Sequence, residues 1–243
     1  MESAIRREKA IKEGLYGILP MVAGTLTVSG TAILISFPLS LGSASLIGVV
    51  ARGRTRTFLR KSVEAMTAIP PVVYGFASLF ILVPFFREFL QDGSGMCLLA
   101  ASLVLAVLVA PTMILMMVAA FESLPRPHLL ALDAVGASPV QKLIHFVLPN
   151  AGKGVFAALI LGLGRAMGDT LIPLMLAGNA PQVAGWLSDS VRTLTAHIAL
   201  VNAADFDSPI FRSSFTAGIL LYATSAAAVS ALRLLHHRRK LMQ

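Results

Sequence analysis

The longest stretch of this chain without an aspartate, glutamate, lysine or arginine runs from Gly14 to Ala51. A helix needs about 20 apolar residues to cross the hydrocarbon core of a bilayer, so this stretch is more than long enough for one crossing. Pro38 and Gly42 lie inside it and predict a kink. A chain with such a stretch is expected to fold within a membrane.

Four further apolar stretches predict spans at 65–86, 93–121, 154–178 and 213–232, which makes five spans in all. The 243 residues are 56% hydrophobic and 13% charged, whereas a soluble domain has roughly 25% charged residues. The sequence therefore predicts an all-α membrane protein. Its parts are an N-terminal tail (1–16) that is able to lie on the membrane as an amphipathic helix, a transmembrane domain (17–235) and a basic C-terminal tail (236–243).

The formal net charge of +8 would also fit a nucleic-acid-binding protein. The basic residues, however, cluster between the apolar stretches and form no basic face, so we expect membrane lipid and no nucleic acid as a partner. Lysine and arginine are usually in excess in cytoplasmic loops. The segments 51–61, 126–153 and 233–240 are therefore expected in the cytoplasm of a multi-pass protein of the plasma (inner) membrane, with an external N-terminus and a cytoplasmic C-terminus.

The cytoplasmic segment 122–153 contains several helix signals. Pro127 suits the first position of a short helix, and Gly136 suits its left-handed C-cap. Ser138 and Gln141 have the spacing of a capping box that starts a second helix, which Pro149 is expected to interrupt. Two interpretations remain open for this two-helix segment: a loop packed against its own bundle, or a helix presented to a groove of a cytoplasmic partner.

This segment resembles the coupling loop of ABC importer permeases, whose signature is Glu-Ala-Ala, three residues, Gly, nine residues, an aliphatic residue, one residue and Leu-Pro. Phe146 stands at the aliphatic position, and Leu130 and Leu132 replace the Glu and Ala that the family commonly has. The resemblance implies the MetI-like permease fold. It also implies a set of residues that contact the ATPase: Ala131, Leu132, Asp133, Gly136, Ala137, Ser138, Leu148 and Pro149.

Two more segments are similar to the phosphate branch of that family: EAMTAIPPVVYGFASL (64–79) and GLGRAMGDT (162–170), where Asp169 replaces a Glu. The resemblance implies a subunit that moves inorganic phosphate into the cell. It implies a second permease subunit, identical or related, a cytoplasmic ABC ATPase dimer and an external phosphate-binding protein as partners. Permeases for molybdate, tungstate or sulfate remain the alternative.

Arg165 and Asp169 lie within the fourth predicted span. An arginine in the middle of a membrane helix costs roughly 3 kcal/mol on insertion scales, and a carboxylate four residues later lies on the same helix face and can pair with it. Either the pair joins helices, or both side chains line a water-filled path. We favour the path: Arg165 would receive the anion, Asp169 would limit its residence, and Thr170 would add a neutral hydrogen bond.

Pro70, Pro71 and Gly75 lie early in the second predicted span, where prolines release backbone carbonyls. They indicate either a kink at a gate or simple shaping of the helix.

The sequence favours a transport subunit over an enzyme. It has no Gly-x-x-x-x-Gly-Lys-Ser/Thr motif, so ATP is expected to be used by the partner subunit. The predicted spans contain no lysine and no histidine, and one cysteine, Cys97, cannot form a metal cluster. We therefore expect no cofactor and no metal on this chain. An autonomous carrier is the other alternative, although a carrier would not need a segment that docks an ATPase.

Overall fold

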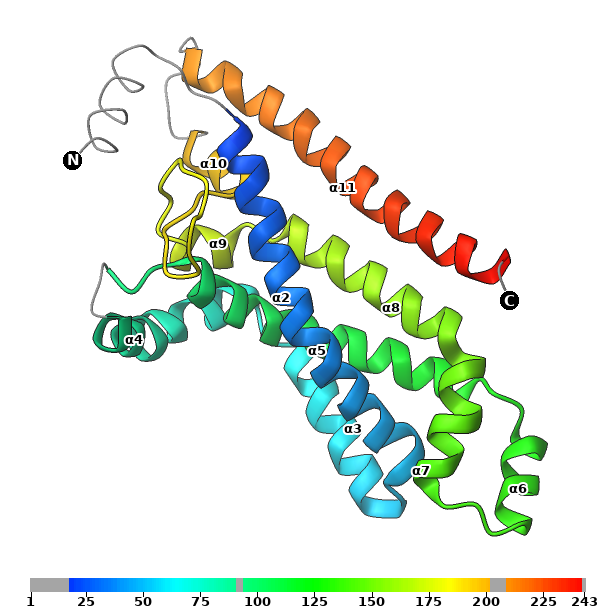
Figure 1. The fold of residues 1–243 in the computed structure, drawn as a ribbon. Coiled ribbons are helices and arrows are strands. Elements are labelled where there is room, and N and C mark those ends of the chain that lie inside the picture. Colours follow the sequence, from blue (N-terminus) through cyan, green and yellow to red (C-terminus); the bar gives the residue numbers. More distant parts are fainter. Residues whose placement is uncertain (1–17, 91–93, 202–208, 242–243) are drawn as a thin grey trace.

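The computed structural model describes residues 18–90, 94–201 and 209–241, and for 90, 209–212 and 232–241 it describes the helical backbone alone. These residues form helices and loops, with one isolated backbone bridge between Gly178 and Val191 (Figure 1). Within these residues, five helices are long and apolar enough to cross a membrane, which confirms the predicted number: Leu19–Val50, Pro71–Phe89, Leu98–Glu122, Pro139–Gly168 and Ser213–Ala231. The predicted N-terminal tail (1–16) lies outside the described residues.

The first span consists of α2 (Leu19–Ser45) and a π-helical turn, η1 (Leu46–Val50). The helix continues through Pro38 and Gly42. Small hydroxyl side chains are buried along it. Ser29 Oγ donates to a carbonyl of its own helix, whereas Ser40 Oγ donates to the Ala110 carbonyl of the third span. Small residues let two membrane helices approach closely, and α2 packs along α5 over much of its length.

The basic segment after the first span was predicted as a cytoplasmic loop, and it forms a helix, α3 (Gly53–Thr67). The second span, α4 (Pro71–Leu90), begins only after a break at 68–70. The prediction that Pro70 and Pro71 lie inside one helix from residue 65 is therefore wrong. Pro71 is the first residue of α4, a position where the missing N–H has no helical partner to lose.

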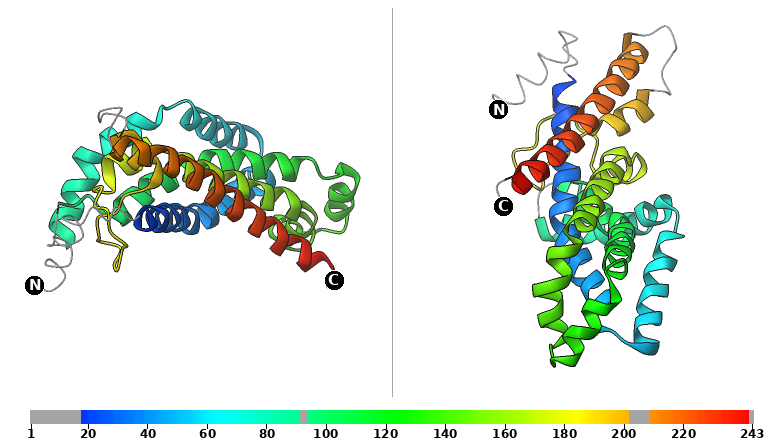
Figure 2. Two further views of the ribbon diagram at one scale, coloured as in Figure 1. Left: turned by 90° about the horizontal axis from the view of Figure 1, so that it is seen from above. Right: turned by 90° about the vertical axis from the view of Figure 1, so that its right-hand side faces the viewer.

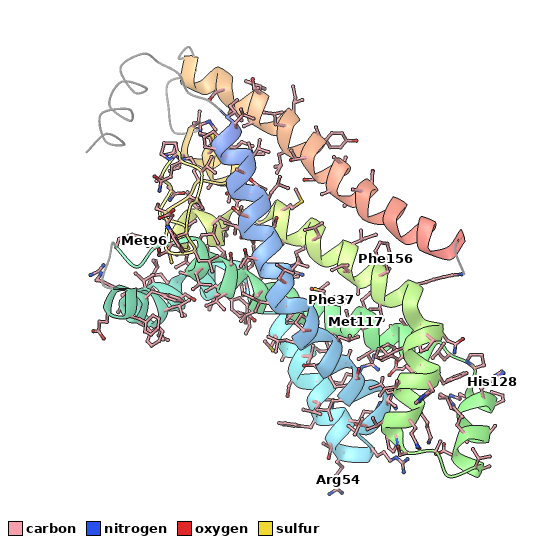
Figure 3. All side chains as sticks on the ribbon, in the orientation of Figure 1. Phe37, Arg54, Met96, Met117, His128 and Phe156 are labelled. Atoms are coloured by element: carbon pink, nitrogen blue, oxygen red, sulfur yellow. The ribbon has the colours of Figure 1, made fainter. Side chains whose placement is uncertain are left out.

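The third span, α5 (Leu98–Glu122), forms the centre of the bundle. It contacts α2, α3, α4, α8 and α9, and its fully buried side chains include Leu105, Met113 and Met117. Figure 3 shows Met117 on α5 close to the part of α2 that carries Phe37. The core of the protein is therefore built around this helix.

The segment after α5 confirms the predicted helix signals. α6 (Arg126–Ala134) is followed by Gly136, whose φ is 78°. The amides of Gly136 and Ala137 donate to the carbonyls of Asp133 and Leu132, respectively. This hydrogen-bond pattern is a Schellman motif, which favours glycine at the left-handed position. Ser138 and Gln141 then form the expected capping box at the start of α7 (Pro139–Lys142).

The predicted interruption at Pro149 is wrong, because α7, η2 (Leu143–Val147) and α8 (Leu148–Gly168) form one continuous helix. Pro149 cannot donate to a helical carbonyl and its ring crowds the preceding turn. The turn η2 is π-helical, and the amide of Leu148 donates to the carbonyl of Leu143 five residues earlier. The wider turn accommodates the proline. The second helix that was predicted in segment 122–153 is therefore the beginning of the fourth span.

The remaining elements are α9 (Leu171–Leu176), α10 (Leu194–Val201) and α11 (Pro209–Leu241). Helix α10 was not predicted, and it packs between α2, α9 and α11. Figure 2 shows α11 along one side of the bundle, beside α8 and the first part of α2. In α11 the helix continues to Leu241, into the basic tail that was predicted from residue 236.

The two ends of the bundle differ in content. Figure 3 shows Arg54 on α3 and His128 on α6 toward one end, and Met96 toward the other end. The second end also holds the loop between α9 and α10, whose Asp189 and Leu187 carbonyls accept from the first two amides of α5. The coupling segment and the basic helix α3 therefore share one end, as the charge distribution predicted.

Candidate functional site

The candidate transport site lies where α8 ends beside α5. Arg165 is in the last turn of α8, and its Nη1 donates to Thr112 Oγ1 on α5 over 2.7 Å. The arginine is half-buried, and the neighbouring positions Gly164 and Gly168 are exposed. The guanidinium is therefore held at one side by a neutral hydroxyl, and a glycine-lined surface lies next to it.

Asp169 does not pair with Arg165, so the predicted helical ion pair is wrong. Helix α8 ends at Gly168, and the backbone of Asp169 is extended, with φ −72° and ψ 131°. Its Oδ1 accepts from the amide of Ile172 over 2.9 Å, and no salt bridge joins it to Arg165 among the described residues. The carboxylate satisfies an amide at the start of α9, as side chains before a helix commonly do.

Thr170 lies between the two helices α8 and α9, and it is half-buried. The carbonyl of its neighbour Asp169 accepts from Thr195 Oγ1 of α10 over 2.9 Å. The predicted residues Arg165, Asp169 and Thr170 are thus adjacent at a helix break, with α10 packed behind them. The break at this point turns the predicted span 154–178 into two helices.

Two glycines near the site lie at close contacts between helices: α8 with α5, and α4 with α9. A methyl group on Gly162 of α8 would lie 2.5 Å from the Met113 sulfur of α5, and one on Gly75 of α4 would lie 2.7 Å from the Met175 sulfur of α9. Gly75, which was predicted to belong to a gate or kink with Pro70 and Pro71, is thus a packing position. The prolines lie at the break before α4, which precedes this contact.

The predicted coupling residues lie at the opposite end from α9 and α10. Ala131, Asp133, Gly136, Ser138 and Pro149 are exposed, and three others are half-buried: Leu132, Ala137 and Leu148. Lys142 is buried, with 8% of its side chain exposed, and forms an ion pair with Asp133. This pair and the Schellman motif fix α6 relative to the start of the fourth span.

Two apolar side chains in and directly after α6 face outward. Leu130 is 67% exposed and Val135 is 79% exposed, although both would be expected to pack inside if this segment were an ordinary loop. Exposed apolar side chains on a short helix are typical of a surface that binds a partner.

Two polar side chains of other helices, Thr112 and His197, were not among the predicted site residues, and Thr112 contacts Arg165 directly. Thr112 follows Pro111 inside a long apolar stretch, and a hydroxyl there was the one available signal. His197 of α10 is 5% exposed, and its Nε2 lies 3.1 Å from Ser213 Oγ. Burial in α10 and a neighbouring Arg192 charge lower the pKa of His197 below its ordinary value.

Comparison with known proteins identifies relatives over most of the chain. Residues 36–241 match the family "Binding-protein-dependent transport system inner membrane component". The chain is 32% identical over 226 residues to the "Probable ABC transporter permease protein YqgH" of Bacillus subtilis, covering 93% of this chain and 73% of that protein. It is 31% identical over 245 residues to the "Phosphate transport system permease protein PstC" of Xylella fastidiosa strain Temecula1, covering 92% of this chain and 74% of that protein.

Solved structures show the same fold. The inward-facing MetNI methionine ABC transporter contains a chain that superposes with a TM-score of 0.68 and 19% identity, covering 90% of this chain and 98% of that chain. A bacterial ABC transporter involved in the import of the acidic polysaccharide alginate gives a TM-score of 0.67 with 16% identity, over 90% of this chain and 79% of that chain. The arrangement of five spans with a coupling segment is therefore that of a MetI-like permease.

Proposed function

Because this chain belongs to the family of binding-protein-dependent transport system inner membrane components, we propose that it is the permease subunit through which an ATP-driven importer moves inorganic phosphate into the cell. The phosphate transport system permease proteins PstC of Xylella fastidiosa and Pasteurella multocida are 31% and 29% identical to this chain in sequence. The chain is a transport subunit rather than an enzyme. The hydrolysis of ATP is assigned to a partner, and no cofactor is assigned to this chain.

The site is assigned from the burial and the hydrogen-bond partner of Arg165. Arg165 is a half-buried cation at the end of a span, with a hydroxyl as its partner and no carboxylate paired to it among the described residues. A guanidinium binds phosphate through two parallel charge-assisted hydrogen bonds. A cation at membrane depth that is not neutralised by a fixed carboxylate is suited to an anion that passes.

Asp169 is assigned the opposite role. One of its oxygens is engaged by the amide of Ile172, and the carboxylate is close enough to Arg165 for their charges to interact. A negative charge there reduces the local positive potential, and it accepts a hydrogen bond from protonated phosphate. We infer that Arg165 receives the anion, that Asp169 limits its residence, and that Thr170 contributes a neutral hydrogen bond.

The partners follow from the two ends of the bundle. The exposed apolar residues Leu130 and Val135 beside Gly136 form the surface that we assign to a cytoplasmic ABC ATPase dimer. The C-terminus is assigned to the same, cytoplasmic side. An external phosphate-binding protein would deliver the anion at the end of α9 and α10. A second permease subunit, identical or related, would complete the path beside the exposed glycines of α8.

The test is phosphate uptake by cells that carry Arg165→Ala. Loss of charge-assisted hydrogen bonds worth about 1.5–3 kcal/mol corresponds to a loss of uptake of about tenfold or more. Lys153→Ala is the matched control, because Lys153 is a cation on the same helix that is exposed near its beginning. Membrane levels of each variant are measured by immunoblot.

Normal uptake by Arg165→Ala at normal abundance would contradict the assignment of the site. Competition with molybdate, tungstate and sulfate separates the phosphate assignment from that of a related oxyanion. Uptake that persists without any ATPase subunit would instead indicate an autonomous carrier.

A further inference from the structure

A polar cavity of about 630 Å³ lies between α3, the end of α5 and the beginning of α6. It is separate from the Arg165 site, because Arg165 contacts Thr112 within α5, whereas the cavity is lined by Phe121 and Glu122 at the end of that helix. One face of α3 borders it, because Arg56, Arg60 and Glu64 are spaced by single helical turns. The cavity is therefore a second candidate site for a charged ligand.

Two arginines of this cavity are already neutralised. Glu122, the last residue of α5, accepts from Arg56 Nη2 over 2.6 Å and from Arg60 Nη1 over 2.9 Å. Arg60 Nε also donates to Glu64 Oε1 over 3.0 Å. Two guanidinium groups thus face two carboxylates, so this network adds no net charge to the cavity.

Two further cations line the same cavity: Lys61 of α3 and Arg126, the first residue of α6. Neither makes an ion pair or a hydrogen bond with another residue of the part that the structure describes. Each of these side chains has a formal charge of +1. The cavity therefore has a surplus of two positive charges, which matches the charge of a phosphate or phosphomonoester dianion.

The depth and the lining of the cavity point to the membrane surface. Glu122 is the last residue of a span, so the charged groups lie at the level of lipid headgroups. Phe121, Leu124 and Leu129 contribute an apolar side to the cavity. Lysines and arginines at this level attract anionic lipids by about 1 kcal/mol each.

We propose that this cavity binds a phosphate-type dianion, supplied either by the headgroup of an anionic phospholipid or by free inorganic phosphate. The ligand bridges Lys61 on α3 to Arg126 on α6 and thereby holds the coupling helix against the bundle. The proposal does not depend on which anion the protein transports, since Arg165 takes no part in it.

The test uses the purified transporter complex in a neutral detergent. Its thermal unfolding is followed while three ligands are added separately: dioctanoyl phosphatidic acid, inorganic phosphate, and dioctanoyl phosphatidylcholine as a lipid without a surplus negative charge. Wild type is compared with Lys61→Gln/Arg126→Gln and with the matched control Arg52→Gln/Arg54→Gln. The control removes two exposed cations from the same region that do not line the cavity.

We expect the anionic ligand to stabilise the wild-type complex in a saturable way. The half-saturating concentration should rise about tenfold or more in Lys61→Gln/Arg126→Gln, as expected for lost charge-assisted bonds, and should stay within about twofold in the control. Much tighter binding of phosphatidic acid than of inorganic phosphate identifies a lipid headgroup as the ligand. Equal affinity for the two identifies free phosphate.

The single variant Lys61→Gln repeats the measurement without altering α6, in case Arg126→Gln prevents assembly with the ATPase. The proposal is overturned if neither anion stabilises the wild type, or if both double variants weaken binding equally. It is also overturned if phosphate binding is unchanged in both double variants, because that binding belongs to the transport path.

Discussion

The helices α5 and α8 are in contact along the bundle and are stabilised in different ways. In the most apolar stretch of α5, 56% of the residues are buried inside the protein, against 22% in the fourth span that contains α8. The core side chains of α5 pack against neighbours on several sides. Buried hydrogen bonds with α2 add to this packing, such as that from Ser102 Oγ to the Val28 carbonyl. The fourth span is held by local hydrogen bonds and by single polar contacts: the capping box at Ser138, the ion pair of Lys142, and the bond from Arg165 to Thr112.

The difference indicates that α5 is fixed in the bundle, whereas the fourth span is able to move beside it. A helix that is packed on all sides has no alternative position, whereas one held by a few polar contacts can change its partners at a small cost in free energy. Arg165 lies on the fourth span, and the coupling segment leads directly into it. If this difference holds, the packing contact between α5 and α8 contributes more to the free energy of unfolding than the local bonds of the fourth span.

The contact itself should give the largest effect on stability. Gly162→Ala places a methyl group 2.5 Å from the Met113 sulfur and 3.2 Å from Val109 Cγ1. Met113 is fully buried, so overpacking should lower the free energy of unfolding by about 2–3 kcal/mol. Thermal unfolding of the purified protein measures it.

Gly164→Ala is the matched control for this prediction. Gly164 lies on the same helix, and a methyl group there would meet no atom of another element within 4 Å. Its stability should equal or slightly exceed that of the wild type, since alanine is the better helix former. Equal losses at both positions would show that the α5–α8 contact is not tightly packed at Gly162.

Removing the hydrogen bond between Thr112 and Arg165 should have the next largest effect in free energy, and it is measured as a loss of phosphate uptake. Thr112→Val keeps the shape but removes the hydroxyl that accepts from Arg165 over 2.7 Å. The guanidinium is then no longer positioned, and a loss of about 1.5–2 kcal/mol corresponds to phosphate uptake about tenfold lower. Thr112→Ser retains the hydroxyl and should keep most of the uptake. Similar defects in both variants would mean that the methyl group, rather than the hydroxyl, matters.

The same contrast explains what could be predicted from the sequence. The five spans and the helix ends at Gly136 and Ser138 were predicted correctly, because span length and helix capping depend on neighbouring residues. The partner of Arg165 was missed because Thr112 lies 53 residues away in sequence. Asp169 was placed on the helix with Arg165 by its spacing alone, and the sequence contains no proline that would mark the end of α8 at Gly168.

The helices α3 and α10 were missed for a related reason. Helix α10 is apolar but has only 8 residues, too few for a span, and the basic residues of α3 suggested a loop. What orders them is contact with distant residues, such as the ion pairs from Arg56 and Arg60 to Glu122 and the packing of α10 against α11. Tertiary contacts of this kind override local propensity.

The ion pair of the coupling segment should have a smaller effect than the Thr112 bond. Asp133→Asn leaves Lys142, with 8% of its side chain exposed, beside a neutral partner. Because Asp133 itself is 51% exposed, solvent screens the pair and the expected loss of stability is about 1–1.5 kcal/mol. A larger consequence is expected in coupling: more ATP should be hydrolysed for each phosphate transported, because α6 is no longer fixed to the fourth span.

Glu122→Gln is the matched control, since it breaks exposed ion pairs of α5 with Arg56 and Arg60. Exposed pairs contribute about 0–1 kcal/mol, and the ratio of ATP hydrolysed to phosphate transported should stay near that of the wild type. If Glu122→Gln uncoupled the transporter as strongly as Asp133→Asn, the fixing of α6 by Lys142 would not be the cause.

The smallest effect is expected at the capping box, where the bonds are entirely local. Ser138→Ala removes the oxygen that accepts from the Gln141 amide over 3.3 Å, and loss of an N-cap costs about 1 kcal/mol. Ser62→Ala is the control, because that hydroxyl donates only to a carbonyl of its own helix among the described residues, and its removal should change stability by a few tenths of a kcal/mol. If Ser138→Ala were instead as destabilising as Gly162→Ala, local bonds would anchor the fourth span as firmly as packing anchors α5, and the fourth span would not be free to move against a fixed α5.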